Sequence, residues 1–455
     1  MLTYELKKSP GVPLYEALYR CIRGDILSGV LPAGYKLPSK RALAQNLEVS
    51  KITVETAYNQ LLSEGYIRAQ EKVGYFVEEV EHHAPKPSPR ANREEAPHPE
   101  PMLDLAGNAT EAFPFSVWSR LQREVMLDYG EKLLAPLPNR GIPELRQAIA
   151  DHLAAFRGMH VDPENILIGA GTDFLYNLLI QLLGRDKTYA VEEPGYGKIR
   201  KIYAAGGVRC VSAPMDRRGV MPEGLEGADV LHFSPSHHFP TGLVTPVSRR
   251  LELLNWAKEA GKWIIEDDYD SEFRFDAHPK PAMMSLDARG RVIYMNTFSK
   301  SLAPSIRISY MVLPGELMED FQKHLGFYSC TVPSFEQYTL ARFLSRGHFE
   351  KHINRMRKFY KQRRNTVVSL LETCAFASKL TILEQDAGLH FILKVQTELS
   401  DRELTWRLSQ AGIRVRALSE YYHDTGEDLH CLVVNYSGLK EDNLKAALEQ
   451  LEEIM

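Results

Sequence analysis

Apolar residues between positions 166 and 298 come in short runs that alternate with helix-like stretches. The runs are "ILIGA", "TYAVEEP", "VLHFSPS", "WIIEDDY" and "VIYMNTF", and helical patterns begin near Thr172, Tyr196 and Ser248. Short apolar runs bounded by turn residues are typical of buried strands. Strands that alternate with helices predict a mostly parallel sheet covered by helices. A later section with "LHFILKV" and "HCLVVNY" between charged helices predicts a smaller α+β lobe.

The chain up to residue 80 shows a different pattern, helices followed by a ribbon. "PLYEALYRCIRGDILSG" predicts a helix that ends at Gly29, and "LPSKRALAQNL" predicts a second one with Ser39 as its N-cap. "VSKITVETAYNQLLSEGY" predicts a third helix that closes on Gly65. "YIRAQEKVGYFV" predicts a two-stranded ribbon with Val73 and Gly74 at or beside its turn. This order is typical of a winged helix-turn-helix, whose second helix enters the major groove of DNA.

A stretch nearly without large apolar side chains follows this head. Residues 81–101, "EHHAPKPSPRANREEAPHPEP", are rich in proline and charge. Such a segment cannot bury enough surface to offset the entropy lost on ordering, so it predicts a linker. We therefore expect an α/β protein with a small head at residues 1–80, a linker at 81–101 and a large body at 102–455.

Composition and charge narrow the class of protein. The hydrophobic fraction of 44% and the charged fraction of 25% are those of a globular protein. The net charge of −4 excludes a protein that is basic overall and coats nucleic acid without sequence preference. The head carries ten Lys and Arg against nine Asp and Glu, so any DNA contact must come from a local patch. Five scattered cysteines without CxxC spacing argue against disulfides and structural zinc. Because the sequence has no apolar leader and no apolar run of membrane length, we expect a cytoplasmic protein without a membrane contact.

The head resembles the GntR-type winged helix over nearly all of residues 11–80. The likeness lies in "LPAGYKLPSKRALAQNLEVSKITVETAYNQLLSEGYI" and "GYFV", with Lys51 where arginine is common in that family. The resemblance implies double-stranded operator DNA as a partner, and Ser50 and Lys51 would bring donors and the positive end of a helix to its phosphates. The alternative is that the basic residues are solvated charges on an interaction module. The expected DNA-binding residues are Lys40, Arg41, Ser50, Lys51, Thr53, Lys72 and Gly74.

Polar side chains gather where the strands of the body end, which is where ligands bind in open α/β sheets. Gly171 and Thr172 open a helix after "ILIG", and backbone N–H groups at a helix start bind anions. "WIIEDDYD" places four acids around Tyr269. Because neighbours in a strand point apart, these acids alone do not form a metal cage, and we expect no metal site.

Lys300 lies among residues that suit a phosphorylated aldehyde. Thr297 and Ser299 precede it directly, and Arg307 follows it by seven positions. Hydroxyls and a guanidinium hold a phosphate, a lysine forms a Schiff base with an aldehyde, and a carboxylate pairs with a pyridinium nitrogen. The alternative is a solvated lysine near an ordinary anion site.

The body resembles the type I aminotransferase fold over about residues 102–455. The matching stretches are "GIPELRQAI", "EEPGY", "PSHHFPTG", "EDDYDSEF" and "TFSKSLAPSIRISY". The resemblance implies pyridoxal 5′-phosphate as cofactor, with Lys300, Asp267 and Tyr269 as the catalytic residues. Asp267 would pair with the pyridine nitrogen, Tyr269 would bond the ring phenolate and Tyr196 would stack on the ring. The phosphate would be bound by Gly171, Thr172, Thr297, Ser299 and Arg307. For Asp268 we expect a structural ion pair instead.

This chain departs from the aminotransferase pattern at two positions, the second of which meets a substrate carboxylate in that family. Phe239 stands where the pattern has asparagine, and Val433 lies near the place of an arginine. Arg414 and Arg416 are candidates to replace that arginine, although both also suit a solvated surface. Lys198 is a further candidate to meet an anionic effector. Asn139 and Arg140 lie near the expected substrate side without an assigned role.

A GntR-type head joined to an aminotransferase-type body resembles the MocR family of transcription regulators, which includes GABA-responsive members. The resemblance implies a homodimer whose body senses pyridoxal phosphate, an amino compound or both, through an internal aldimine at Lys300. Two other functions stay open, a working aminotransferase with an accessory head and a sensor that controls the supply of the cofactor. The intact helix-turn-helix motif of the head favours the regulator. The presence of Lys300, Asp267 and Tyr269 is compatible with a slow half-reaction with an amine.

Overall fold

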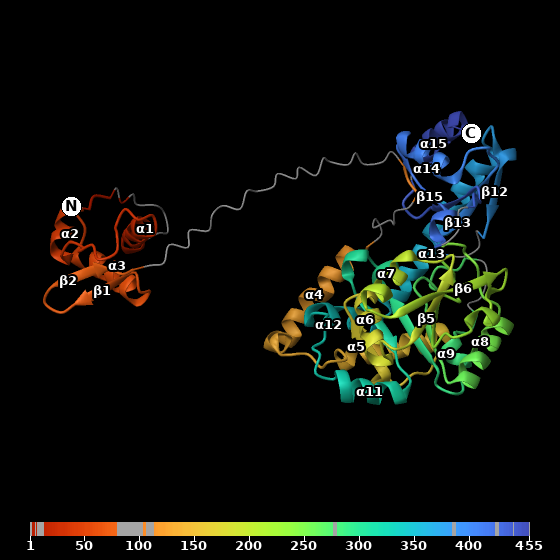
Figure 1. Ribbon diagram of the computed structural model, residues 1–455, viewed down its shortest axis with the longest axis horizontal. Helices are drawn as coiled ribbons and strands as arrows, with labels where there is room; N and C mark the ends of the chain where they lie inside the picture. The colour runs from red at the N-terminus through yellow and green to blue at the C-terminus, as the bar shows by residue number, and fades with distance from the viewer. Residues whose placement is uncertain are drawn as a thin grey trace. The chain divides into compact units, whose positions relative to one another are not determined.

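The structure is a computed structural model that describes residues 2–4, 6, 13–79, 103–105, 113–275, 280–384, 388–423, 427–439 and 441–454. The chain forms two compact units, Met1–His98 and Pro99–Met455, each with its own core (Figure 1). The linker expected at residues 81–101 lies outside the described residues. The boundaries at residues 80 and 102 therefore stay predictions.

The first unit is the expected winged helix-turn-helix. Ser39 accepts the backbone N–H of Ala42 at 3.2 Å, and Ser50 accepts that of Thr53 at 3.0 Å, so both serines cap helix starts as N-caps do. The strands pair antiparallel with Gln70 opposite Gly74. The predicted helices and ribbon are confirmed. The elements are α1 (Leu14–Leu27), α2 (Lys40–Asn46), α3 (Lys51–Ser63), β1 (Ile67–Gln70) and β2 (Gly74–Val77).

The second unit is built on an eight-stranded, mostly parallel sheet. In spatial order its strands are β4 (Ile166–Gly169), β11 (Ser309–Val312), β10 (Val292–Thr297), β9 (Trp263–Asp267), β8 (Val230–Phe233), β5 (Thr188–Glu193), β6 (Arg209–Asp216) and β7 (Gly219–Val220). Strands β11 and β7 run antiparallel to their neighbours. The five apolar runs are strands β4, β5, β8, β9 and β10, as predicted.

Strands β6 and β11 were not predicted from the apolar pattern, and each has a physical reason. Most of β6 is only partly buried and begins and ends on exposed charged residues, so it lacks the continuous apolar run of a central strand. Strand β11 is short and directly follows the lysine motif, which reads as a loop in the sequence.

Helices cover both faces of this sheet. One core joins the sheet to α4 (Phe115–Tyr129), α5 (Pro143–Arg157) and α12 (Ser334–Ser345). Another joins it to α6 (Thr172–Leu183), α7 (Gly197–Ala205) and α11 (Gly315–Leu325), and α8 (Val247–Ala260) packs on a third. Shorter turns of helix are η1 (Gly130–Leu134), η2 (Pro163–Asn165), η3 (Pro222–Leu225), α9 (Met283–Leu286), α10 (Phe298–Ser301) and η4 (Pro304–Ile306).

The predicted smaller lobe is an antiparallel sheet with helices. Its strands lie in the order β12 (Leu380–Leu383), β13 (His390–Val395), β16 (Cys431–Asn435) and β15 (Arg416–Ala417), and β14 (Ile413–Arg414) pairs with β3 (Leu103–Asp104). The remaining elements are α14 (Asp401–Gln410), α15 (Glu441–Ile454), η5 (Ala377–Lys379) and η6 (Leu418–Tyr421).

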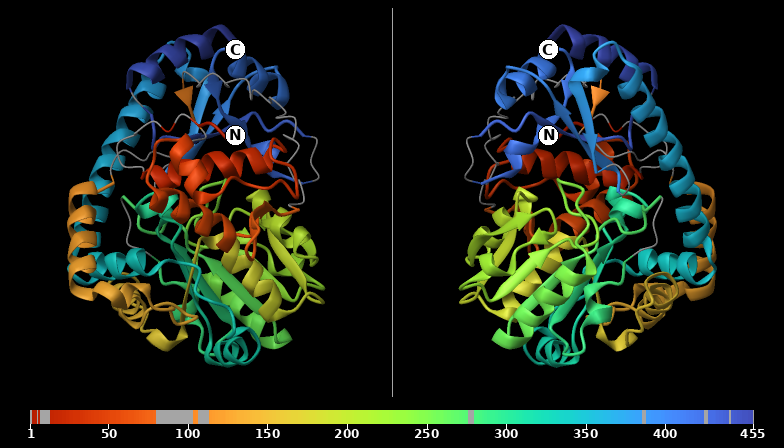
Figure 2. Two further views of the ribbon diagram at one scale, coloured as in Figure 1. Left: turned by 90° about the vertical axis from the view of Figure 1, so that its left-hand side faces the viewer. Right: turned by 90° about the vertical axis from the view of Figure 1, so that its right-hand side faces the viewer.

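The long helix α13 (His348–Thr373) joins the two parts of the second unit. Phe349 and Ile353, near its start, belong to the core of the large sheet, whereas Tyr360 and Val367 belong to the core of the lobe. Figure 2 shows this helix running along one side of the second unit into the lobe. One rigid element therefore sets the position of the lobe against the strand ends of the large sheet.

Within the described ranges, no helix has both the length and the apolar character that crossing a membrane requires. The same residues contain no group of three or more His, Cys, Asp and Glu side chains placed to hold a metal ion.

Candidate functional site

Lys300 lies on α10, directly after the central strand β10. The hydroxyl of Thr297 accepts the backbone N–H of Ser299 at 3.2 Å and the hydroxyl of Ser309 at 2.8 Å, which fixes the turn that carries Lys300. Burial lowers the pKa of Lys300, and the negative charge of Asp270 partly opposes that effect. A lysine with a lowered pKa carries more of its neutral, nucleophilic amine at neutral pH.

Asp267 ends the neighbouring strand β9 and is nearly fully buried. Its Oδ2 accepts the hydroxyl of Tyr176 at 2.5 Å and lies 3.4 Å from Nε2 of His232. Its Oδ1 is also buried but has no hydrogen-bond partner among the described residues. A buried carboxylate oxygen without a partner is costly unless a cation or donor meets it, and a pyridinium N–H is such a group.

Asp268, the next residue, is held by a buried ion pair, although its Oδ1 also lacks a hydrogen-bond partner among the described residues. Its Oδ2 lies 3.0 Å from Nη2 of Arg157 and accepts the hydroxyl of Tyr294 at 2.6 Å, and the side chains of the ion pair are buried. Burial raises the pKa of Asp268, but the charge of Arg157 and the side-chain hydrogen bonds to the carboxylate together outweigh it, so the net shift is downward. The expected structural ion pair is confirmed.

Tyr269 keeps its proton as a potential donor. Burial first, and then the charges of Asp270 and Asp267, raise the pKa of its hydroxyl well above the ordinary value. The hydroxyl lies 3.3 Å from Nδ1 of His237, which in turn lies 2.7 Å from Oδ2 of Asp270. The tyrosine is thus held by a chain of polar groups at the end of β9.

Gly171 and Arg307 form a narrow anion cradle beside the start of α6. Gly171 has φ of +89°, and a Cβ there would lie 2.6 Å from Nη2 of Arg307, so only glycine leaves room for the guanidinium. Oδ2 of Asp173 lies 2.7 Å from Nζ of Lys198 and 3.5 Å from Nη2 of Arg307. Two cations therefore converge on one anionic oxygen at the first turn of a helix, the place where phosphates bind.

The other predicted cofactor residues differ in their exposure and in the contacts that they make. Thr172 is the first residue of α6, and Ser299 is half-buried on the turn before Lys300. The hydroxyl of Thr297 accepts the hydrogen bonds from Ser299 and Ser309 that stabilise the turn. Tyr196 is half-exposed at the start of α7, with its ring edge-on to that of Phe239 at 5.9 Å.

Four site residues were missed by the sequence analysis: Tyr176, His232, His237 and His390. Tyr176 follows Thr172 by one helical turn, a spacing that gives a usable signal. The sequence gives no signal for the three histidines, because histidines buried in an ordinary core look the same in a sequence. His390 comes from the lobe, and burial first, then His237 and Lys300, lower its pKa well below the ordinary value. The ring of His390 lies 4.7 Å from that of His237, the histidine that bonds Asp270.

In the head, the predicted DNA-binding residues divide into exposed and internal ones. Arg41 and Lys51 are exposed and line a groove of about 410 Å³ together with Ala44, Gln45 and Val49. Lys40 is half-buried, and its Nζ lies 2.7 Å from the carboxylate of Glu55 and over the ring of Tyr75.

The remaining predicted DNA-binding residues cap helix α3 or form the turn of the ribbon. Ser50 caps α3, and its hydroxyl lies 2.8 Å from that of Thr53. Lys72 and Gly74 both have positive φ, +59° and +139°, and lie in and directly after the turn of the ribbon. The structure thus presents Arg41 near the start of α2, Lys51 at the start of α3, the helix expected to enter the major groove, and Lys72 on the wing.

The residues without an assigned role also have partners. Asn139 donates to the carbonyl of Gly326 at 2.9 Å, and Arg140 is paired with Glu164. Arg414 is paired with Asp104. Arg416 lies directly opposite Val433 in the lobe sheet.

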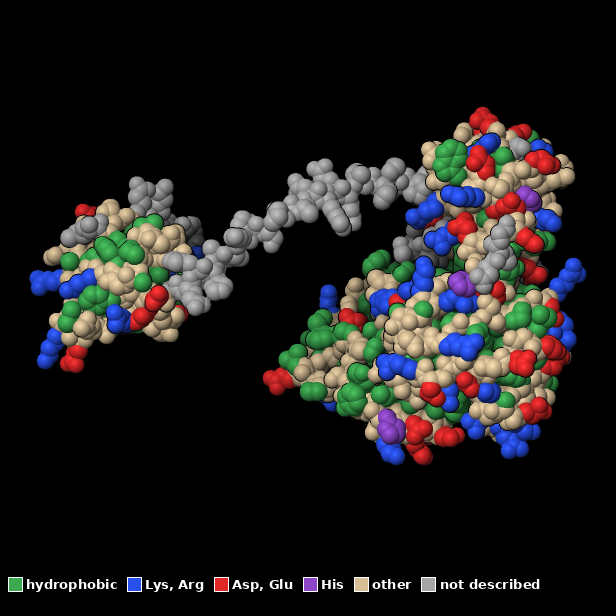
Figure 3. All heavy atoms as spheres, in the orientation of Figure 1, with side chains coloured by type: hydrophobic (Ala, Val, Ile, Leu, Met, Phe, Trp, Pro, Cys, Tyr) green, Lys and Arg blue, Asp and Glu red, His purple; other side chains and the backbone are tan. Residues whose placement is uncertain are grey.

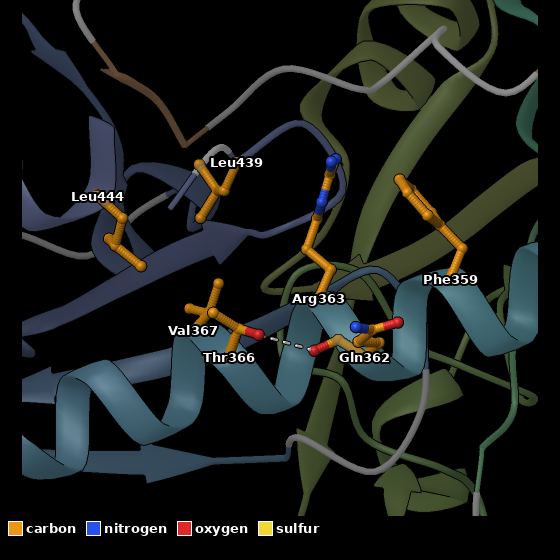
Figure 4. A pocket seen from close by; sticks show the side chains of 7 residues that line it. All are labelled: Phe359, Gln362, Arg363, Thr366, Val367, Leu439 and Leu444. Atoms are coloured by element: carbon orange, nitrogen blue, oxygen red, sulfur yellow. Dashed lines mark hydrogen bonds between the residues drawn. The ribbon is translucent and has the colours of Figure 1, made fainter. Parts of the chain in front are cut away.

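A separate hollow of about 390 Å³ lies along α13 (Figure 4). Its lining contains none of the predicted site residues, and the hydroxyl of Thr366 bonds the carbonyl of Gln362 within the helix. The described residues that line it are Phe359, Gln362, Arg363, Thr366, Val367, Leu439 and Leu444. The hollow is therefore distinct from the strand-end site.

Comparison with known proteins agrees with this geometry. Residues 14–77 match the family described as bacterial regulatory proteins, gntR family, and residues 100–451 match aminotransferase class I and II. The HTH-type transcriptional regulator YdeL of Bacillus subtilis is 35% identical over 99% of this chain and 98% of its own. The probable rhizopine catabolism regulatory protein MocR of Rhizobium meliloti is 33% identical over 98% of this chain and 94% of its own. The chain belongs to the MocR family of transcription regulators.

Solved structures agree with the fold of this MocR-family chain. The kynurenine aminotransferase of Pyrococcus horikoshii has a TM-score of 0.68 and 25% identity, over 78% of this chain and 90% of its own. The second unit is thus a type I aminotransferase fold, a fold that generally depends on pyridoxal phosphate. The head is a DNA-binding module of a kind that binds operators.

Proposed function

We propose that this chain is a pyridoxal-phosphate-dependent transcription regulator. Its head binds operator DNA, and its body holds the cofactor at Lys300 and senses an amino compound through it. The observation that carries the proposal is the buried Oδ1 of Asp267, which lacks a partner at the end of the strand beside the one that carries Lys300. A lysine of lowered pKa and a buried carboxylate oxygen in need of a cation match the two ends of this cofactor.

The residues present fit the cofactor group by group. Lys300 would supply the amine that holds the aldehyde group of the cofactor. Asp267 would accept the pyridinium N–H, and Tyr269 would donate its hydroxyl toward the ring oxygen. Gly171, Thr172, Ser299 and Arg307 would hold the phosphate and Tyr196 would cover the ring, while Thr297 fixes the turn. When bound, the cofactor would supply an electrophilic carbon to the amino group of an effector.

An amino compound regulates DNA binding if it favours one of two body conformations. Such a ligand shifts the populations of those conformations, and a head joined to the body shifts with them. A coupling of about 1–3 kcal/mol changes the affinity for DNA by roughly 5–150-fold. Turnover is not required for this effect.

An apolar surface on the body supports the expected homodimer. Phe115, Leu127 and Leu134 are 72%, 77% and 76% exposed. Figure 3 shows hydrophobic side chains gathered over α4 and its end. A monomer rarely exposes such a patch, and paired heads match operators with two half-sites. Sedimentation equilibrium tests this assembly, since we expect twice the mass of one chain for the wild type and a lower mass for Leu127→Asp.

Two measurements test the proposed function. Purified protein given pyridoxal phosphate should absorb in the visible range, and promoter DNA upstream of its own or a neighbouring gene should shift in a gel. A protein that stays colourless with added cofactor contradicts the pocket. A protein that binds the promoter no better than unrelated DNA contradicts the regulator.

A working aminotransferase is the second candidate, because Lys300, Asp267 and Tyr269 are all in place. Phe239 and Val433 disfavour it for ordinary amino acids, since neither offers a donor to a carboxylate. Repeated turnover of an amino acid and a 2-oxo acid would support the enzyme. A single spectral change without accumulating product would support the regulator.

A further inference from the structure

One line of exposed side chains runs along helix α3 of the head. Ile52, Thr56 and Asn59 follow one another at positions i, i+4 and i+7, which places them on one side of the helix, and all three are exposed. This line is therefore the side of α3 that a partner outside the head meets. The opposite side packs into the core of the head, and its buried residues are Val54, Ala57, Tyr58 and Leu61.

Ile52 brings a large apolar side chain to the first turn of this line. It is the second residue of α3, directly after Lys51, and it is 74% exposed. Single exposed aliphatic residues are common on protein surfaces, but in a helix-turn-helix the first turn of the second helix contacts base edges. A hydrophobic contact there needs an apolar group on the DNA, and in the major groove that group is the methyl of thymine.

Thr56 extends this apolar contact by one helical turn. Its hydroxyl donates to the carbonyl of Ile52 at 2.9 Å, within the helix. This bond occupies the proton of the hydroxyl, so the side chain offers its methyl group to an outside partner. The two side chains are neighbours on the surface, because residues four apart lie one above the other on a helix.

Asn59 ends the line with an amide. No hydrogen bond joins its exposed side chain to another described residue. An amide has a carbonyl acceptor and an NH₂ donor, which match the N6 amino group and the N7 acceptor of adenine in the major groove. An apolar contact with thymine and an amide paired with adenine both select A·T base pairs.

The charged neighbours of this line do not oppose such a contact. Glu55 is the acidic residue beside it, and Nζ of Lys40 lies 2.7 Å from the carboxylate of Glu55. This ion pair reduces the repulsion between the carboxylate and the phosphates of DNA. The line itself contains no arginine or lysine, the residues that most often read guanine. Arg41 and Lys51 are exposed beside it and suit phosphates, which carry no sequence information.

We propose that Ile52 and Thr56 contact thymine methyl groups in the major groove and that Asn59 pairs with an adenine. The head thereby selects operators whose half-sites present A·T pairs to α3. The inference rests on the proposed function, because the head must bind DNA before it can select a sequence. The basic residues of the head supply the part of the affinity that does not depend on sequence.

Promoter DNA with altered bases tests this inference on the full-length protein. A fragment upstream of the chain's own gene is prepared unmodified, with uracil in place of thymine, and with 7-deazaadenine in place of adenine. Uracil lacks the methyl group of thymine, and 7-deazaadenine lacks the N7 acceptor of adenine. Fluorescence anisotropy measures the affinity for each form, and unrelated DNA with the same modifications gives the non-specific reference.

We expect both modifications to weaken binding of the wild type. The uracil form should bind about tenfold more weakly, because a buried methyl contributes roughly three- to fourfold and paired heads read two half-sites. The 7-deazaadenine form should bind at least about fivefold more weakly, since it loses one bond of a bidentate pair.

Variants assign each penalty to its side chains. The double variant Ile52→Ala with Thr56→Ser should bind the thymine and uracil forms equally within about twofold, the usual error of such a cycle, and keep the penalty for 7-deazaadenine. Asn59→Ala should show the reverse. Val30→Ala is the matched control, because Val30 is an aliphatic residue outside α3 that is 67% exposed, and it should keep both penalties. None of these variants should change the slope of affinity against salt, because no phosphate contact is lost.

The outcomes separate this inference from the proposed function. A wild type that binds the promoter no better than unrelated DNA contradicts the proposed function. A wild type that prefers the promoter but binds its uracil form equally well contradicts the role of Ile52 and Thr56, and this comparison needs no variant. A uracil penalty of the same size in the double variant contradicts that role as well, since the penalty then comes from the shape of the DNA. An Asn59→Ala protein that keeps the penalty for 7-deazaadenine contradicts the role of Asn59.

Discussion

The head and the body place their functional side chains in opposite environments. In the head, Arg41 and Lys51 are exposed at the start of two helices, where they meet a large charged partner from outside. In the body, Asp267 is buried and Lys300 is partly buried, at the ends of neighbouring strands. Exposed charges contribute to binding through long-range, salt-dependent attraction, whereas buried ones act through pKa shifts and unpaired polar atoms.

This difference predicts which property a substitution will change. A substitution of Arg41 or Lys51 in the head should change the affinity for DNA and its salt dependence, while the stability of the fold stays the same. A substitution at the strand ends should change cofactor binding, stability or their dependence on pH. Each experiment below tests this division, in order of the expected size of the effect.

Lys300→Ala should abolish the visible absorption band completely. The variant has no amine to join the aldehyde, so added pyridoxal phosphate should leave only its free spectrum. Absorption spectra of dialysed protein measure this directly. The matched control is Lys201→Ala, an exposed lysine on α7 that should keep the full band. A band of wild-type intensity in Lys300→Ala would contradict the assignment.

Two neighbouring carboxylates should fail in different ways. Asp268→Asn leaves Arg157 buried without its ion-pair partner, and we expect a loss of about 3–5 kcal/mol in the free energy of unfolding. Asp267→Asn should instead weaken cofactor binding by about 10–100-fold, because a charge-assisted bond to the pyridinium is lost. Urea unfolding and fluorescence titration with pyridoxal phosphate separate the two effects. The same loss of cofactor affinity in both variants would refute the division of roles.

Glu272 should make stability depend on pH. Burial, followed by the charge of Asp268, raises its pKa from 4.5 to about 8. Between those pH values the native protein holds a proton that the unfolded chain releases, so stability falls as pH rises from about 4.5 to 8. Glu272→Gln should remove this loss, with a gain over the wild type of roughly 3–5 kcal/mol at pH 8 and little gain at pH 5. Urea midpoints at both pH values measure it, and an equal gain at both would contradict the shifted pKa.

Arg41→Ala should weaken binding to promoter DNA by about tenfold and lower the slope of affinity against salt by about one. The thermal midpoint should stay within the error of the measurement, because the side chain is exposed. Fluorescence anisotropy at several salt concentrations gives both quantities. Arg20→Ala on α1 is the control, an exposed arginine away from the groove. A changed midpoint with an unchanged salt slope would place Arg41 in the fold and not in the interface.

The head could be predicted from the sequence almost completely, because its signals are local. The N-caps Ser39 and Ser50 and the ribbon turn each depend on a few neighbouring residues. In the body, apolar runs predicted five strands equally well, namely β4, β5, β8, β9 and β10. Strand β6, next to the short edge strand β7, was not predicted, because partial burial removes the apolar pattern on which the prediction depends.

The site was predictable only in part, because part of it is made by long-range contacts. Lys300 and Asp267 could be found because each belongs to a continuous motif, Asp267 at the end of β9 and Lys300 directly after β10. Tyr176 and His390 reach the site from a helix and from the lobe, and no spacing in the sequence connects them to Asp267 or Lys300. The difference between Arg414 and Arg416 depends on strand pairing, and the sequence left both open.

The central claim is that Lys300 links ligand sensing in the body to DNA binding by the head. The most direct test is the affinity for promoter DNA of wild type and Lys300→Ala, each measured alone, with pyridoxal phosphate, and with pyridoxal phosphate plus the amine that most changes the spectrum. We expect at least one addition to shift the affinity of the wild type by roughly 5–150-fold and neither to shift that of Lys300→Ala. Equal shifts in both proteins, or no shift in the wild type, would contradict the claim.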